Sequence, residues 1–550
     1  MAPTDWLLSA AERGNPDTRL DARHPDGSAW SEGNLVRPFV HGATYFAELV
    51  ERIEAAGEGD LVLFTDWRGD ADEQLLGVPG SEVSAVMRRA VGRGADVRGL
   101  MWRSHANIEE FSHEENRELG RKVDDKGENG NVLLDKRVPP RGSHHQKLVV
   151  IRYAGRPEDD VAYVGGIDLC HSRRDDARHL GDPQAQPMSE HYGATPPWHD
   201  VQCAISGPAV YDVETVFRER WEDDSPLTRS RRRHRKDRRH VDVHAEPLPE
   251  QAPPPPPVPG GTHIVQLLRT YADRRIGDSY PFARKGERSV ARGYGKALEM
   301  ARELIYVEDQ YLWSRAIADS FVESLERNTG LHMIVVLPRW TDSDNLVSRM
   351  PQLLGRQRAM SRLAAAAPGR VAFYAPENVH GTPVYVHAKV CVVDDRWCTV
   401  GSDNFNRRSW THDSELSAVV VDTAADDHSP YARRLRLVLA AEHLDRGLDG
   451  PEYPGEVSDE PGKLPDDDEL LGLMGDCLDA EGTFRAFAES AAALEEWHRA
   501  GRRGERPPGR LRPLRAPRLN PLVMALAAPA YLWLHDPDGR PWRLRLKRRY

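Results

Sequence analysis

Two short segments of the chain carry the same arrangement of histidine and lysine. His145 and Lys147 stand two residues apart at the start of a β-branched run, and His387 and Lys389 repeat the arrangement 242 residues later. Residues two apart in a strand project from one face, so each histidine lies beside its lysine. Histidine suits nucleophilic or proton-transfer chemistry near neutral pH, and lysine offers an anion a positive charge and three donors. Each segment therefore has the residue types of half a phosphate site.

A glycine-containing turn, a polar residue and a downstream carboxylate follow each pair in the same order. These residues are Gly165, Gly166, Asp168 and Asp200 in the first copy, and Gly401, Ser402, Asn404 and Glu415 in the second. A single His-x-Lys pair on a strand is ordinary and indicates little. Its repetition with the same following residues indicates function, and we interpret the two copies as halves of one active site.

Two imidazoles on opposite sides of one phosphorus atom predict a covalent mechanism. One imidazole attacks in line while the other protonates the leaving oxygen, and the second then activates water or an alcohol to release the phosphoryl group. Lys147, Lys389 and Asn404 are the expected donors to the phosphoryl oxygens, with Ser402 in support.

The two downstream carboxylates have an expected role of their own. Asp200 and Glu415 are predicted to hold the Nδ1–H groups of the histidines and to favour the imidazolium form. A metal site is the main competing interpretation of the histidines, but the neighbouring lysines would repel a cation. The sequence therefore predicts no metal and no other cofactor in the reaction.

Short strands alternate with helices around both pairs. In the first half the expected strands are residues 61–65, 97–102, the first His-x-Lys strand and its hairpin partner 161–164. In the second half they are 304–307, 333–337 and 371–374. The expected helices are 82–93, 292–304, 315–328 and 345–366. A polar loop is expected over residues 107–130. The alternation predicts an α/β fold with two pseudo-twofold-related α/β sandwich domains and the active site at their interface.

Changes in composition predict five regions along the chain. They are an N-terminal lead without an assigned fold (1–38), a first half (39–226), a basic and proline-rich linker (227–262), a second half (263–448) and a C-terminal extension (449–550). The arginines of residues 229–239 fit either a solvated linker, which we favour, or a patch for nucleic acid or anionic lipid. In the extension a helix is expected at 481–499.

The end of the chain reads as a hairpin of residues 531–534 and 542–547 around a turn at 536–539. Trp542, Leu544 and Leu546 alternate with basic residues in its second strand. Such a strand fits an anionic membrane surface or, as we favour, an edge strand protected by charge.

The bulk composition limits the class of protein. A net charge of −11 does not favour a dedicated binder of polyanions. The five cysteines form no Cys-x-x-Cys pair, which favours a reducing compartment. Neither a signal peptide nor an apolar run long enough to span a bilayer is apparent. We therefore expect a cytoplasmic protein that contacts membranes peripherally.

The paired segments resemble the HKD motifs of the phospholipase D superfamily. The second matches the full pattern with His387, Lys389, Asp394, Gly401, Ser402 and Asn404. The first is similar to the eukaryotic-type branch, as are the segments 197–201, 266–270, 305–311 and 441–444, while modules resembling C2, PX or PH domains are missing. The resemblance implies a phosphohistidine intermediate with His145 as nucleophile, and hydrolysis or transphosphatidylation of phospholipid headgroups.

The resemblance leaves other functions to be weighed. Within the superfamily, the alternatives are phospholipid-synthase-type transfer and nuclease activity; outside it, a non-catalytic scaffold. The expected partner is a phospholipid at a membrane surface, nucleic acid is not expected, and no protein partner is predicted.

One position departs from the family pattern. Arg152 occupies the place of the first motif's aspartate, and the first histidine lies 20 residues from its glycine rather than 14. That aspartate is expected to serve the hairpin turn and not the reaction, so Asp159 or Asp160 is expected to replace it.

Overall fold

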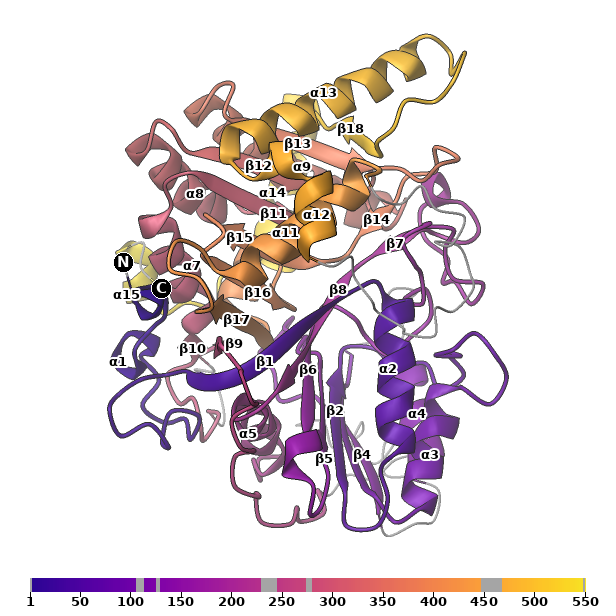
Figure 1. Cartoon of the computed structure of the whole chain (residues 1–550), viewed down its shortest axis with the longest axis vertical. Helices are drawn as coiled ribbons and strands as arrows, with labels where there is room; N and C mark the ends of the chain where they lie inside the picture. The colour runs from indigo at the N-terminus through magenta and orange to yellow at the C-terminus, as the bar shows by residue number, and fades with distance from the viewer. Residues whose placement is uncertain are drawn as a thin grey trace.

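The computed structural model describes residues 2–104, 113–124, 129–228, 245–273, 279–446, 467–547 and 550. Over these residues the chain forms two α/β halves whose strands join into one continuous sheet (Figure 1). The prediction of an α/β fold built from two related halves is confirmed. No helix in the described segments has both the length and the apolar character needed to cross a bilayer.

The first half contains seven strands of the sheet. In spatial order these are β4 (Gly130–Asp135), β3 (Asp96–Trp102), β2 (Leu61–Asp66), β5 (Leu148–Arg152), β6 (Val161–Gly165), β8 (Val201–Ser206) and β1 (Ser31–Val40). The first three are parallel and the others antiparallel. Helices α2 (Gly42–Glu54), α3 (Val83–Gly92) and α4 (His113–Val123) bury their apolar sides in one core with this sheet.

The second half repeats this order element by element. Its strands run β13 (Val371–Pro376), β12 (His332–Val336), β11 (Leu304–Asp309), β15 (Lys389–Val393), β16 (Trp397–Gly401), β17 (Glu415–Asp422) and β9 (His263–Tyr271). Helices α7 (Ser289–Met300), α8 (Arg315–Arg327) and α9 (Leu346–Ala366) take the places of α2, α3 and α4. The shared strand order is the predicted pseudo-twofold relation.

The two halves meet along strands that the sequence did not predict. β1 and β9 pair antiparallel, with Ser31 opposite Val265 and Asn34 opposite His263. On the other face of the sheet, α5 (Ala209–Trp221) and α11 (Pro430–His443) share one continuous core that draws residues from both halves. The halves are thus joined by backbone pairing and by buried apolar side chains.

The N-terminal lead is not a separate segment without structure. β1 crosses the expected boundary at residue 39, and Trp6, Leu7 and Leu8 are buried in the core of the second half. Likewise, the expected loop at 107–130 contains α4 and leads into β4. Gly33, Asn34 and Pro38 obscured β1 in the sequence because they are usual in turns, whereas two neighbouring strands hold them here.

The predicted C-terminal hairpin is wrong. Residues Pro521–Ala530 form helix α14, the segment Tyr531–His535 continues it in a wider helical turn, and Trp542–Leu546 form the short helix α15. The Asn520 side chain accepts a hydrogen bond from the backbone of Leu522 and begins α14, with Pro521 in its first turn. This start leads the helix into residues 531–534, where the first strand of the hairpin was expected.

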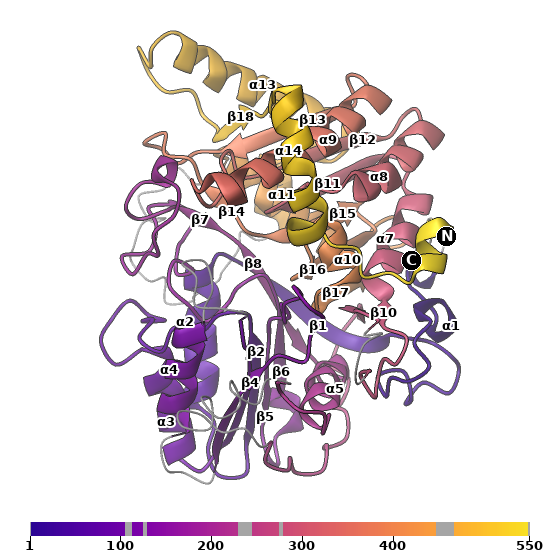
Figure 2. The same cartoon turned by 180° about the vertical axis from the view of Figure 1, so that it is seen from behind.

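The remaining C-terminal residues extend the second half. β18 (Leu511–Pro513) pairs with the edge strand β13, and α13 (Ala480–Arg499) confirms the helix expected at 481–499. Figure 2 shows α14 crossing the second half on the side turned away from the viewer in Figure 1, with α9 behind it. The arginine block at 229–239 lies outside the described residues, and the prolines Pro253–Pro257 form neither helix nor strand.

Candidate active site

The two histidine segments lie where the halves meet. His145 and Lys147 immediately precede β5, and Lys389 begins β15 two residues after His387. The His145 backbone N–H donates to the Ser414 carbonyl, 2.9 Å away, and the His387 N–H donates to the His199 carbonyl at 2.7 Å. Each histidine segment is therefore held by the segment that carries the other half's carboxylate.

The side chains cross between the halves in the same way. His145 Nδ1 lies 2.9 Å from Glu415 Oε2, and His387 Nδ1 lies 2.6 Å from Asp200 Oδ2. Both carboxylates are buried. Because Nδ1 of each ring is engaged, Nε2 is the atom left for a reacting group. The side-chain roles predicted for Asp200 and Glu415 agree with this geometry, although the sequence did not indicate that the pairs cross.

The two lysines are buried beside the histidines. Lys147 Nζ donates to the His145 carbonyl at 3.0 Å and lies 3.4 Å from Asp168 Oδ1. Lys389 Nζ donates to the His387 carbonyl and to Gln310 Oε1, which is 3.3 Å away. Buried ammonium groups with few fixed anionic partners favour an incoming anion.

The polar residues after the glycine turns take different positions. Asp168 Oδ1 accepts hydrogen bonds from the backbone of Trp67 (3.0 Å) and Arg68 (3.3 Å), and so fixes the loop after β2. Ser402 Oγ donates to Glu415 Oε2 at 2.6 Å, which supports that carboxylate. The buried Asn404 Oδ1 has no hydrogen-bond partner among the described residues. Asp168 and Ser402 are thus positioning groups.

The charges of the two half-sites act on one another. Burial and the ammonium groups of Lys147 and Lys389 lower the pKa of the His145 imidazole well below its usual value. Burial lowers the pKa of His387 in the same direction, with Lys389 and Arg173 as the next causes. Each neutral imidazole can therefore accept a proton or act as a nucleophile at neutral pH.

Burial shifts the pKa values of both carboxylates and of one lysine. Burial, with the charge of Asp413, raises the pKa of Glu415 to about 8. Burial also raises the pKa of Asp200, against the lowering effect of Lys389. For Lys389 itself, burial lowers the pKa to about 8. In each histidine–carboxylate pair, a small change in the local charge can therefore move the shared proton between the imidazole and the carboxylate.

The aspartate of the second motif serves the hairpin, as expected. Asp394 accepts hydrogen bonds from the backbone N–H groups of residues 302, 303 and 304, at 2.7, 2.8 and 2.9 Å, just before β11. In the first half the carboxylate comes from the other strand, because Asp60 before β2 accepts from Ala154 at 2.7 Å. Asp160 binds Arg152 (2.6 Å) and the Tyr153 backbone (2.7 Å), so Asp160 rather than Asp159 stabilises the longer turn.

Two site residues were not predicted from the sequence. The guanidinium of Arg173 stacks 4.0 Å from the centre of the Trp198 ring, and that ring lies 4.9 Å from His387. Gln310, at the end of β11, binds Lys389 as described above. Gln310 belongs to a segment with family resemblance, but nothing local to Arg173 distinguished it from other arginines.

Comparisons with known proteins agree with this arrangement. Residues 85–323 match the family model described as phospholipase D, and residues 294–435 match the model described as cardiolipin synthase, PLD-like domain. Phospholipase D A of Dictyostelium discoideum is 25% identical over 487 residues, covering 74% of this chain and 35% of that protein. Phospholipase D alpha 1 of Cynara cardunculus is 24% identical over 505 residues, covering 68% of this chain and 60% of that protein.

The chain thus spans between about a third and three fifths of the length of these two relatives.

Among solved structures, phosphatidylserine synthase of Haemophilus influenzae superposes with a TM-score of 0.49 at 13% identity, covering 85% of this chain and 93% of that one. The two family matches together extend from residue 85 to residue 435 and include both histidine–lysine pairs. The chain belongs to the phospholipase D superfamily.

Proposed function

We propose that the protein is a phospholipase D that cleaves phospholipid headgroups through a phosphohistidine intermediate. The observation that carries the proposal is the pair of imidazoles, each with Nδ1 bound to the opposite half's carboxylate and with a buried lysine beside it. Hydrolysis and transfer to an alcohol differ only in the acceptor, and both follow from the same site.

In the first step His145 Nε2 attacks phosphorus and the bond to the headgroup oxygen breaks. His387 takes part in this step as the imidazolium paired with the Asp200 carboxylate: its Nε2–H gives a proton to the leaving oxygen and the ring becomes neutral. Lys147, Lys389 and Asn404 donate to the phosphoryl oxygens. In the second step His387 Nε2 removes a proton from water or an alcohol, whose oxygen attacks phosphorus and breaks the P–N bond. The choice of His145 as nucleophile follows the family resemblance, because the two half-sites have the same contacts.

A surface beside the site supports a lipid substrate. Seven of the fifteen exposed large apolar side chains in the described residues fall between residues 522 and 546. Five of them form what we name the C-terminal apolar surface, on α14 and the turn after it: Leu522, Leu526, Leu532, Trp533 and Leu534. Leu526 is 73% exposed and Trp533 is 68% exposed. Apolar exposure on this scale is typical of an interface with lipid or protein.

The C-terminal apolar surface is attached to the loops of the active site. Arg141, four residues before His145, donates to the Trp533 carbonyl at 3.1 Å. The Asp536 carboxylate accepts from the backbone of Arg407 (2.6 Å), three residues after Asn404. Residues 509–550 contain ten arginines and lysines against two aspartates. Apolar side chains with basic neighbours fit an anionic bilayer, so we propose peripheral membrane contact through this surface.

Substrate specificity is tested by offering lipid and nucleic acid in parallel. The expected result is choline release from phosphatidylcholine vesicles, with formation of the phosphatidyl alcohol when a primary alcohol is added. Cleavage of single- or double-stranded DNA without lipid turnover would instead indicate a nuclease. Synthesis of a new phospholipid without net hydrolysis would indicate a transferase.

The intermediate is tested by trapping. Quenching with denaturant at alkaline pH during turnover should trap a phosphoryl adduct on the wild-type protein that later treatment with acid removes, and His145→Ala should abolish it. His387→Ala should retain the adduct but release it slowly. If only His387→Ala abolishes the adduct, the roles of the two histidines are reversed, and if neither variant does, another residue is the nucleophile. A wild-type protein that forms no adduct and turns over no phosphodiester would be a scaffold without catalysis.

A further inference from the structure

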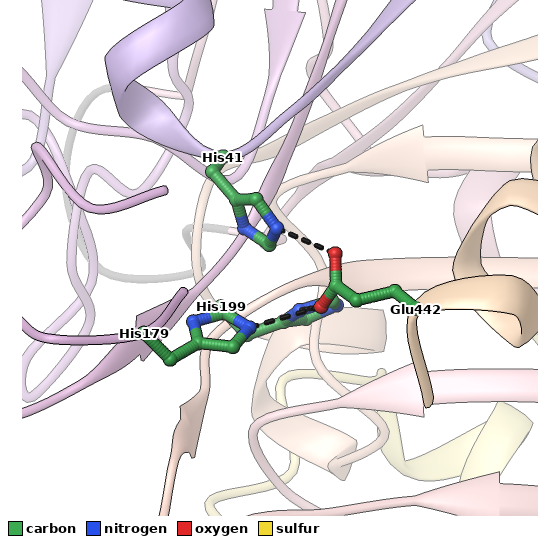
Figure 3. A group of neighbouring side chains, drawn as sticks. All are labelled: His41, His179, His199 and Glu442. Atoms are coloured by element: carbon green, nitrogen blue, oxygen red, sulfur yellow. Dashed lines mark hydrogen bonds and ion pairs between the residues drawn. The ribbon is translucent and has the colours of Figure 1, made fainter. Parts of the chain in front are cut away.

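A second group of histidines and carboxylates lies behind the active site and takes no part in the reaction described above. His41, His179, His199 and Glu442 gather with their donor atoms within 4.8 Å of one another, and all four are buried (Figure 3). Glu442 Oε2 lies 2.7 Å from His41 Nε2, and Glu442 Oε1 lies 2.9 Å from His179 Nε2 and 3.2 Å from His199 Nδ1. We name these four residues the histidine–glutamate cluster.

The rings of the histidine–glutamate cluster are arranged around a common point. Their centres are 4.7, 5.1 and 5.6 Å apart, and the ring planes are inclined by 82°, 70° and 51°. Three imidazoles bound to one tetrahedral zinc ion, with Zn–N bonds of about 2.0–2.1 Å, have ring centres about 5.2 Å apart. The nitrogen–oxygen separations are a few tenths of an ångström shorter than about 3.3 Å, the spacing of zinc ligands. A shift of the Glu442 carboxylate by a few tenths of an ångström away from the three rings would therefore make room for an ion.

The distal nitrogens of two rings have the partners usual around a bound metal. His199 Nε2 lies 2.6 Å from Glu308 Oε2, and His179 Nδ1 lies 3.2 Å from the Trp198 carbonyl. Metal-binding imidazoles usually donate their second N–H to a carboxylate or a backbone carbonyl, which fixes the ring. Glu308 is itself held by His443 Nε2 at 2.8 Å and by the Tyr306 hydroxyl at 2.5 Å.

The charges near the histidine–glutamate cluster favour a divalent cation. The hydrogen-bond partners of the Glu442 and Glu308 carboxylates are imidazoles and the Tyr306 hydroxyl, and neither carboxylate forms an ion pair with lysine or arginine in the described part of the chain. In the absence of an ion, ring protons on the histidines compensate these carboxylates, as the raised pKa of His199, about 10 beside Glu308, indicates. Metal binding requires neutral imidazoles, and one divalent ion would supply the positive charge in place of those protons.

The backbone at two of the ligands is strained. His41 has φ 76° and ψ 156°, and His179 has φ 54°. Residues other than glycine rarely adopt positive φ, at a cost of about 1–3 kcal/mol each in the sparsely populated regions. Such strain persists where the surrounding structure requires a particular side-chain position. Here it aims two imidazoles at the same point.

We propose that His41, His179, His199 and Glu442 bind one divalent transition-metal ion, with zinc as the expected occupant. Nitrogen and oxygen ligands in this number suit tetrahedral zinc, and four buried protein ligands leave no position for substrate. The ion would be structural, because it joins three ligands of the first half to α11 of the second. It would also fix the segment before Asp200, the carboxylate that holds His387.

Metal content and the spectrum of a substituted ion test the site. Purified protein incubated with zinc and dialysed should retain one zinc per chain by elemental analysis, and cobalt substitution should give the intense visible absorption of a tetrahedral ion. Removal of the ion by a strong chelator should lower the melting temperature by several degrees. Failure to retain zinc at pH 7.5 would overturn the proposal.

Variants locate the ion. Glu442→Gln and His41→Ala should lose the bound zinc and the cobalt spectrum, whereas Glu308→Gln should weaken binding by about 10- to 100-fold, as the loss of an outer partner does. His263→Gln is the matched control, because His263 is buried and bound to Asp422 but lies outside the histidine–glutamate cluster. If His41→Ala does not fold, Glu442→Gln, which keeps the side-chain shape, decides. A cobalt spectrum unchanged in Glu442→Gln would place the ion elsewhere and overturn the proposal.

Discussion

At the scale of single residues, each reactive imidazole depends on a carboxylate from the opposite half. The Nδ1 atoms of His145 and His387 are 2.9 and 2.6 Å from Glu415 and Asp200. A buried carboxylate in this position selects the tautomer that presents Nε2 and stabilises the imidazolium that forms during proton transfer. The reaction is therefore sensitive to how the halves sit against each other as well as to the histidines.

The Asp200→Asn substitution tests this dependence. An amide of the same shape keeps the packing but cannot stabilise the imidazolium, so kcat should fall by about 10²- to 10⁴-fold with a much smaller change in KM. Steady-state headgroup release measures both constants. Glu415→Gln should act in the same direction, and the exposed Asp427→Asn is the control. Activity of Asp200→Asn above half of the wild-type value would contradict the role.

The low pKa of Lys389 predicts how anion binding depends on pH. Because burial lowers this pKa to about 8, the ammonium form is complete below pH 7 and is lost as the pH rises through 8. Sulfate, which does not titrate in this range, should bind more weakly at pH 9 than at pH 7, with proton uptake near pH 8. Calorimetry in two buffers of different ionisation enthalpy measures the uptake.

Lys389→Arg supplies the comparison for this measurement. Arginine stays charged throughout the range, so the pH dependence of sulfate affinity between 7 and 9 should be smaller in the variant, with only the ionisation of Glu415 left to contribute. A wild-type affinity that is constant over this range would show that Lys389 does not control binding.

The sequence identified the site residues more completely than their connections. The repeated spacing located both histidines, both lysines, Asn404 and the two carboxylates. It did not reveal that Asp200 serves His387 and Glu415 serves His145, because that pairing depends on strands that meet only in the folded sheet. Arg173 was missed for a similar reason, since its position over Trp198 has no local signal.

At the scale of elements, the two hairpins after the histidines are tied to the neighbouring strand by different carboxylates. In the second half Asp394, at the end of β15, binds three backbone N–H groups that precede β11. In the first half Asp60 precedes β2 and binds the backbone after β5. Both arrangements tie the neighbouring strands together at the end away from the histidine.

Asp394→Ala should therefore affect stability and not chemistry. Loss of three hydrogen bonds to a half-buried carboxylate should destabilise the protein by about 2 kcal/mol. A lower urea midpoint with unchanged kcat per folded molecule is the expected result. Since β15 separates Asp394 from Lys389, a fall in kcat without a loss of stability would contradict the structural role.

Strands with clear apolar runs were predicted well from the sequence. β1, which is held in the sheet by hydrogen bonds to a neighbouring strand on each side, was not predicted. β2, β3, β11, β12 and β13 each lie within a residue or two of the predicted range. β1 was missed because its glycine, asparagine and proline favour turns when read locally. The C-terminal hairpin failed for the opposite reason, since alternation over five residues is too short to distinguish a strand from a helix in which Trp542 and Leu546 are one turn apart.

At the scale of the whole molecule, the sheet passes without a break from one half to the other through β1 and β9. The crossed carboxylates lie on the strands next to this junction or immediately before them. The regional boundaries at residues 226, 262 and 448 stay predictions, while the boundary at 39 falls within β1.

The C-terminal apolar surface predicts how the protein meets its substrate. A Leu526→Ser/Trp533→Ser double substitution should weaken binding to vesicles that contain anionic phospholipid by about 10- to 100-fold, because two large side chains lose their burial in lipid. Vesicle sedimentation measures binding, which should also weaken at high salt.

A soluble short-chain substrate separates this effect from catalysis. Turnover of that substrate by the double variant should match the wild type, because neither side chain belongs to the reacting groups. Leu76→Ser, in the first half, is the control for exposed apolar side chains. Unchanged sedimentation of the double variant would show that another surface meets the bilayer, while loss of turnover on both substrates would point to damage at the site.

The crossing of the carboxylates has a consequence for the ancestry of the protein. A solitary ancestral half would have carried an imidazole without its carboxylate and a carboxylate without its imidazole, and would have been inert as a monomer. Two identical subunits, joined edge to edge at the strand that became β1 in one copy and β9 in the other, would have completed both pairs at once. In a duplicated and fused chain the two copies would be free to diverge, and the two turns do differ, one using Asp394 and the other Asp60.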